Sequence, residues 1–128
     1  MSFQSPLGKA LGPGSAKSGA DHWLSQRLTA VALVPLGLWF VIAVATFEHH
    51  GNYQQVAAWV AEPLNAILLI LLVVALVYHS MLGVQVIIED YVHGALEALS
   101  LIASKFVHVI LAVAGIYSVV VTSLGVGQ

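Results

Sequence analysis

The sequence contains no cysteine and few charged residues, and both absences restrict what the chain can be. Without cysteine it cannot form a disulfide, a thiolate metal site or an iron–sulfur site from its own residues. Charged residues make up 8% of the 128 residues, whereas a soluble domain carries about 25%. Only four are lysine or arginine, which argues against a nucleic-acid-binding surface. The chain is therefore expected to lie in a lipid bilayer.

Long apolar runs take the place of charge. Hydrophobic residues make up 59% of the chain, and the mean hydropathy is +0.94. Three segments are near or above the roughly 20 residues that a helix needs to cross a bilayer, and they span about 28–47, 64–88 and 106–126. The predicted fold class is an all-α membrane protein, with three transmembrane helices in one anchor domain of residues 28–128.

The residues before the first span form a polar leader. Residues 1–27 are rich in glycine, serine and alanine, so we expect an extended segment that becomes ordered only by docking on another protein. Three of the four basic residues precede the first span, and the loop 48–62 has none. The positive-inside bias therefore predicts a cytoplasmic N-terminus and an outer C-terminus.

The second apolar run contains an imidazole, His79, directly after the segment AILLILLVVALVY. An ionisable residue inside a membrane helix is costly and suggests a functional site. Gly83 follows one turn later, and Asp90 lies about 16 Å further along a continuous helix and within about 20° of the same face. Two interpretations stay open from the residues alone. His79 is either an axial haem ligand, with Gly83 leaving room for the macrocycle, or a buried histidine hydrogen-bonded to another helix.

A haem held by His79 would need a second protein ligand. With a third span starting near residue 106, His108 is predicted to lie close to the membrane boundary, so the second ligand is expected from a partner subunit. His49 and His50 lack further ligands nearby and are predicted to be solvated. The link between the second and third spans contains His93 and Glu97, spaced i and i+4. Both are expected to lie on the surface and to touch a partner.

Several polar side chains cluster where the first two spans meet the cytoplasmic boundary. A tyrosine hydroxyl backed by a carboxylate, as in Asp90-Tyr91, can donate a hydrogen bond to a carbonyl oxygen and relay a proton. Tyrosine is equally common at membrane interfaces, whatever its function. Arg27 can pair with a carboxylate such as a haem propionate, or it can simply set the topology.

Two patterns in these segments resemble the small membrane-anchor subunits of succinate dehydrogenase. The segment His79–Tyr91 follows H-x3-G-x6-D-Y, which is similar to the second helix of that family, and Arg27–Ala30 follows the R-x-T-A start of its first helix. The layout of leader, three spans and outer C-terminus is also similar.

The resemblance implies a fold and a set of partners. The chain would form half of a heterodimeric helical bundle that holds haem b, together with a second three-helix cytochrome b membrane subunit. A flavoprotein and an iron–sulfur subunit would dock on the cytoplasmic face, and electrons from succinate would reduce ubiquinone. The chain alone would not be catalytic. Its location would be the bacterial cytoplasmic (inner) membrane, or the mitochondrial inner membrane in a eukaryote.

The resemblance also implies residue roles. His79 would be an axial ligand of the haem iron, with Gly83 beside the macrocycle, and Tyr91 would donate a hydrogen bond to ubiquinone beside Asp90. Arg27 would contact a haem propionate or the quinone site, and His22 is a second propionate candidate.

Two rival functions are considered. The first is the anchor of a fumarate reductase, which works in the opposite direction. The second is a transporter or channel subunit in which His79 and Asp90 relay protons. That function calls for polar residues along more than one helix, whereas the first span offers only Thr29 and Thr46.

Overall fold

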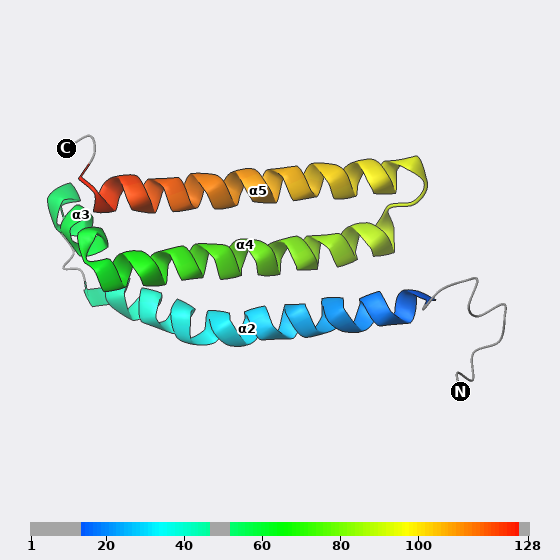
Figure 1. The fold of residues 1–128 in the computed structure, drawn as a ribbon, viewed down its shortest axis with the longest axis horizontal. Helices are drawn as coiled ribbons and strands as arrows, with labels where there is room; N and C mark the ends of the chain where they lie inside the picture. Colours follow the sequence, from blue (N-terminus) through cyan, green and yellow to red (C-terminus); the bar gives the residue numbers. More distant parts are fainter. Residues whose placement is uncertain (1–13, 47–51, 126–128) are drawn as a thin grey trace, which may run out of the picture.

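The computed structural model describes residues 14–46 and 52–125, and their backbone is almost entirely helical (Figure 1). The helices are α2 (Gly14–Thr46), α3 (Tyr53–Ala61), α4 (Pro63–Tyr91) and α5 (Ala95–Ser123). Within these ranges α2 (from Gly19), α4 and α5 are long and apolar enough to cross a membrane. A backbone in lipid must satisfy its own hydrogen bonds, which is why the long apolar runs are helices. The predicted class, an all-α membrane protein with three spans, is confirmed.

Two segments predicted to lack helix are helical. Residues 14–27 belong to α2, so this part of the leader is not extended, because its alanine, leucine, glutamine and arginine residues favour helix and no proline interrupts them. The inner link is also shorter than predicted, since only Val92–Gly94 separate α4 from α5. Gly94 turns the chain with φ +74, and Glu97 then lies in the first turn of α5, where an acid is favourable.

The segment between α2 and α4 contains a short helix, α3, which the apolar pattern does not predict. Its N-terminus is closed by a capping box, in which Gln55 N donates to Asn52 Oδ1 at 2.9 Å and Asn52 N donates to Gln55 Oε1 at 3.3 Å. The Trp59 ring stacks on Trp39 of α2, with centroids 5.6 Å apart, and the Trp59 carbonyl accepts a hydrogen bond from Asn65 of α4. These contacts hold α3 against α2 and the start of α4. His49 and His50 lie outside the described residues.

The three long helices lie side by side in one layer (Figure 1). The middle helix, α4, packs against α2 on one side and α5 on the other, and within the described ranges α2 and α5 do not touch. Few side chains are enclosed as a result. The buried residues of the described part are Ala57, Leu69, Leu82 and His108. Such a layer leaves two broad apolar faces for lipid or for another membrane protein.

The helices α4 and α5 approach each other closely at Gly115. A Cβ at this position would lie 2.9 Å from Val73 Cγ1, closer than side chains in contact normally approach. A residue without a side chain is therefore needed for the two backbones to approach each other, as is common between membrane helices.

We expect Gly115→Ala to destabilise the assembled protein by about 1 kcal/mol, the lower end of the cost of overpacking. The added methyl group meets a β-branched side chain that cannot rotate away. Thermal unfolding of the purified complex measures the loss. The double variant Gly115→Ala/Val73→Ala should recover most of it, because the obstructing methyl groups are gone. An equal loss in both variants would contradict this packing account.

Candidate functional site

His79 lies deep within α4 and faces α2. By its position in the helix it is about 24 Å from the N-terminal end of α4 and about 18 Å from the C-terminal end. Its Nδ1 is 2.9 Å from Thr29 Oγ1 of α2. The same hydroxyl is 2.9 Å from the Ser25 carbonyl oxygen and 3.0 Å from that of Gln26. Among the described residues, no group forms a hydrogen bond with His79 Nε2.

Further polar groups continue from Thr29 toward the N-terminal end of α2. His22, Gln26 and Thr29 are spaced i, i+4 and i+7, so they share one face of the helix. His22 Nε2 and Gln26 Oε1 are buried and have no hydrogen-bond partner within the described part of the chain. An unpaired buried polar atom costs about 1–3 kcal/mol, so both atoms require a ligand, water or a partner subunit. We refer to His22, Gln26, Thr29 and His79 as the polar row.

Gly83 lies beside this row on α4. A Cβ there would lie 3.7 Å from Gln26 Nε2, an ordinary van der Waals distance. The open side of Gly83 therefore faces Gln26, one turn along α2 from Thr29. The sequence analysis missed Gln26 because it considered the ionisable residues near the boundary. Its i+4 spacing from His22 is the signal that identifies it.

Arg27 is not part of the polar row. Its guanidinium carbon lies 4.3 Å from the centroid of the Trp23 ring, and both side chains are exposed. One residue corresponds to about 100° of rotation around a helix, so Arg27 points away from the face that carries Gln26. This arrangement does not bring Arg27 to His79, and it leaves the guanidinium accessible to lipid headgroups or to another subunit.

Asp90 and Tyr91 form the last residues of α4, at the end of the layer where α2 begins (Figure 1). Tyr91 is 81% exposed and Asp90 is also exposed. Neither side chain forms a hydrogen bond within the described residues. Both are therefore accessible to a ligand at the predicted cytoplasmic boundary.

His108 lies near the middle of α5, the third candidate span, so its predicted place near the boundary is wrong. Because α5 begins at Ala95, His108 is about 20 Å from that end of the helix. It is also buried, and both ring nitrogens are engaged. Nδ1 donates to the Ser104 carbonyl oxygen at 2.7 Å, so Nε2, 3.2 Å from Ser80 Oγ, accepts the serine hydroxyl. Neither nitrogen can act as a metal ligand while these bonds are formed.

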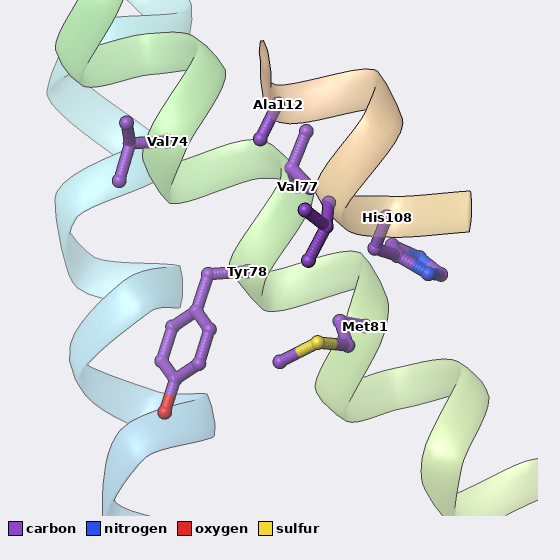
Figure 2. Close-up of a pocket in the computed structure, with 7 residues that line it drawn as sticks. Val74, Val77, Tyr78, Met81, His108 and Ala112 are labelled. Carbon is purple, nitrogen blue, oxygen red and sulfur yellow. The ribbon is translucent and has the colours of Figure 1, made fainter. Parts of the chain in front are cut away.

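Two adjacent residues of α4 form hydrogen bonds to the helices on either side, at the same level along α4. His79 reaches Thr29 of α2, and Ser80 reaches His108 of α5. Beside His108 is an open groove of about 230 Å³ between α4 and α5 (Figure 2). Its lining is almost entirely apolar and consists of Val74, Val77, Tyr78, Met81, His108, Val109 and Ala112.

We expect Ser80→Ala to weaken the contact between α4 and α5 by about 0.6 kcal/mol, the mean for hydrogen bonds between membrane helices. The change leaves His108 Nε2 without its donor in an apolar groove. Thermal unfolding of the purified complex provides the measurement. Ser118→Ala is the matched control, since Ser118 is exposed and bonds only within its own helix, to the Ala114 carbonyl. Equal stabilities of the two variants would rule out a role for Ser80.

The two predicted link residues are separated by the turn. His93 is exposed in the link, whereas Glu97 lies in the first turn of α5, so they do not share a helix face. Within the described ranges, no three His, Asp or Glu side chains gather into a group that could hold a metal ion. A metal held at His79 would therefore need ligands from a prosthetic group or another chain.

Comparison with known proteins gives consistent matches along the chain. The family model described as succinate dehydrogenase/fumarate reductase transmembrane subunit matches residues 1–124. A protein of Rickettsia bellii is 39% identical over 119 residues, covering 91% of this chain and 94% of its own length. A protein of Rickettsia conorii is 36% identical over 107 residues, covering 81% of this chain and 84% of its own length. A protein of Paracoccus denitrificans is 29% identical over 125 residues, covering 98% of this chain and 96% of its own length. All three are named succinate dehydrogenase hydrophobic membrane anchor subunit. No solved structure matches.

Proposed function

Because the chain belongs to the family of succinate dehydrogenase and fumarate reductase transmembrane subunits, we propose that it anchors a succinate dehydrogenase in the membrane. It would hold a flavoprotein and an iron–sulfur subunit at the membrane surface, and electrons from succinate would pass through them to ubiquinone. The names of the relatives favour succinate oxidation over fumarate reduction. The chain supplies an anchor and binding groups, and it catalyses no step by itself.

A second membrane subunit is part of this proposal. The open layer of α2, α4 and α5 encloses almost no core of its own, which supports a partner on one of its faces. We expect this partner to be a three-helix cytochrome b subunit that completes a helical bundle. The inner end of α4 then faces the bacterial cytoplasm or the mitochondrial matrix, and the membrane is the bacterial cytoplasmic membrane or the mitochondrial inner membrane.

The residues of the polar row fit haem b. The single observation that supports this most strongly is that His79 Nε2 has no partner in the described chain while Nδ1 is bonded to Thr29. A neutral imidazole binds haem iron through such a nitrogen. The second axial ligand would come from the partner subunit, because both nitrogens of His108 are engaged. Bound haem b would supply a one-electron carrier.

The rest of the row fits the polar edge of the macrocycle. Gln26 and His22 lie about 4.5 and 10.5 Å from Thr29 along α2, toward the predicted cytoplasmic end. Their buried atoms without partners are suited to haem propionates, whose oxygens accept the side-chain N–H groups. A flip of the Gln26 side-chain amide exchanges the positions of Oε1 and Nε2, so Gln26 can present its N–H to a propionate. Gly83 has no side chain, which allows Gln26 to lie close to α4. Arg27 would reach a propionate only if the partner subunit and the haem lie on the exposed side of α2 that carries Arg27 and Trp23.

The end of α4 fits a quinone headgroup. Tyr91 is exposed and can donate its hydroxyl hydrogen to a quinone carbonyl oxygen, and the carboxylate of its exposed neighbour Asp90 would pass a proton toward it. Asp90 lies about 16 Å along α4 from His79, on nearly the same helix face. The quinone site and the haem ligand would therefore be held in register by one rigid helix.

Purification through an affinity tag on this chain tests the proposed function. A flavoprotein, an iron–sulfur subunit and a second membrane subunit should co-purify, and the complex should reduce ubiquinone when succinate is added. A chain that purifies without flavin and without succinate-dependent activity would contradict the proposal. A complex that reduces fumarate with a low-potential quinol much faster than it oxidises succinate would assign it to fumarate reduction.

A further inference from the structure

Thr29 is the hydrogen-bond partner of His79, and its hydroxyl has one hydrogen to share among three acceptors. Thr29 Oγ1 lies 2.9 Å from His79 Nδ1, and 2.9 and 3.0 Å from the carbonyl oxygens of Ser25 and Gln26. Bonding of a threonine hydroxyl to the preceding helical turn is common. The position of this hydrogen determines which nitrogen of His79 carries a proton.

Two arrangements are possible for a neutral ring. In the first, Thr29 donates to the backbone and His79 Nδ1–H donates to Thr29 Oγ1, so two hydrogen bonds form and Nε2 keeps a lone pair. In the second, Thr29 donates to Nδ1 and the proton moves to Nε2. No acceptor for Nε2–H exists among the described residues. A donor without a partner is costly in hydrocarbon, so the first arrangement is favoured.

We propose that Thr29 is a positioning residue for haem, which holds His79 in the tautomer and orientation that present Nε2 to the iron. The inference rests on the proposed haem-binding function. Metal-bound histidines commonly donate their other N–H to a second group, which fixes the ring and raises its basicity as a ligand. Thr29 is well suited to this role, because its branched side chain has few rotamers and its hydroxyl is held by the helix backbone.

The test uses the whole complex and compares two variants. Thr29→Val replaces the hydroxyl with a methyl group of similar size, whereas Thr29→Ser keeps the hydroxyl. Thr46→Val is the matched control, because Thr46 lies on the same helix, is exposed and, among the described residues, bonds only to the Ala43 carbonyl. Haem per flavin, the rate of haem transfer to an apoprotein acceptor and the midpoint potential are measured for each variant.

Thr29→Val should weaken haem retention about 10- to 100-fold, the usual cost of removing such an outer partner. The less basic imidazole stabilises ferric iron less, so the midpoint potential should rise. A loss of one hydrogen bond shifts the ferric–ferrous equilibrium about 2- to 12-fold, which corresponds to about 20 to 65 mV for a one-electron couple. Thr29→Ser and Thr46→Val should resemble the wild type. Where Thr29→Val does not assemble, Thr29→Ala removes the hydroxyl without a methyl group against the ring and must give the same shift.

The outcomes separate this inference from the proposed function. If His79→Ala loses the haem but the variant without the hydroxyl keeps the wild-type retention and potential, Thr29 has no positioning role and the haem-binding function stands. If His79→Ala keeps its haem with unchanged axial ligation, the haem-binding function fails, and the role of Thr29 fails with it. A Thr29→Ser variant as impaired as Thr29→Val would also overturn the inference, because the hydroxyl would not be the cause.

Discussion

We expect that replacing His79 with alanine will abolish stable haem binding in the purified complex, while the three helices still insert. The imidazole would supply one of two axial ligands, and the other histidine near the middle of a long helix, His108, has both ring nitrogens engaged. We expect haem retention to fall by more than about 100-fold. Removing a residue that is only hydrogen-bonded to a metal ligand already weakens binding by up to about 100-fold. The ratio of haem to flavin in the purified complex measures the loss.

His108→Ala is the matched control for this experiment. Both histidines lie near the middle of their helices, but His108 has both nitrogens engaged by Ser104 and Ser80. Its replacement should lower thermal stability and leave the axial ligation of the haem unchanged. Normal haem with unchanged ligation in His79→Ala, or a loss of the haem in His108→Ala alone, would mean that the ligand has been assigned to the wrong residue.

We expect that replacing Tyr91 with phenylalanine will slow ubiquinone reduction by succinate. The ring stays, so packing changes little, but the exposed hydroxyl no longer donates to the quinone oxygen. One such bond is worth about 0.5–1.5 kcal/mol, which corresponds to a loss of about 2- to 12-fold. Where the bond strengthens as negative charge develops on the oxygen, the loss reaches about 100-fold or more. Steady-state kinetics with a short-chain ubiquinone measure the effect.

Two controls locate the effect of Tyr91→Phe. Succinate oxidation by an artificial acceptor that takes electrons from the soluble subunits should be normal, because it bypasses the membrane. Tyr117→Phe removes the hydroxyl of another exposed tyrosine, on α5 and far from the end of α4 that carries Tyr91, and should be silent. Unchanged turnover and quinone affinity in Tyr91→Phe would make Tyr91 an ordinary interfacial aromatic residue and place the quinone elsewhere.

Much of the fold follows from the apolar runs, because a helix must be about 20 residues long and largely apolar to cross lipid. The start of α5 was placed too late because Glu97, Ser100, Ser104 and Lys105 interrupt the apolar run. These residues still allow helix, and Gly94 supplies the turn before it. The depth of His108 was misjudged for the same reason. The helix α3 was missed because its nine residues are too few for a membrane span.

The candidate site was only partly predictable. His79 was identified because an ionisable residue in an apolar run is costly. Thr29 lies 50 residues before His79 in the sequence. Their contact depends on the rotation and register of α2 and α4, which apolar patterning does not determine. The rotation between Gln26 and Arg27, about 100°, could have shown that they face different surroundings. Arg27 was selected for its charge, and Gln26 was overlooked because it has none.

The reduced-minus-oxidised optical spectrum of the wild-type complex, purified through a tag on this chain, tests the central claim most directly. A chain that anchors succinate dehydrogenase and binds haem through His79 should co-purify with flavin and show a b-type signal, with one haem for each copy of the chain. A complex with flavin and full succinate-to-ubiquinone activity but no b-type signal would contradict the haem site built on His79 and Thr29.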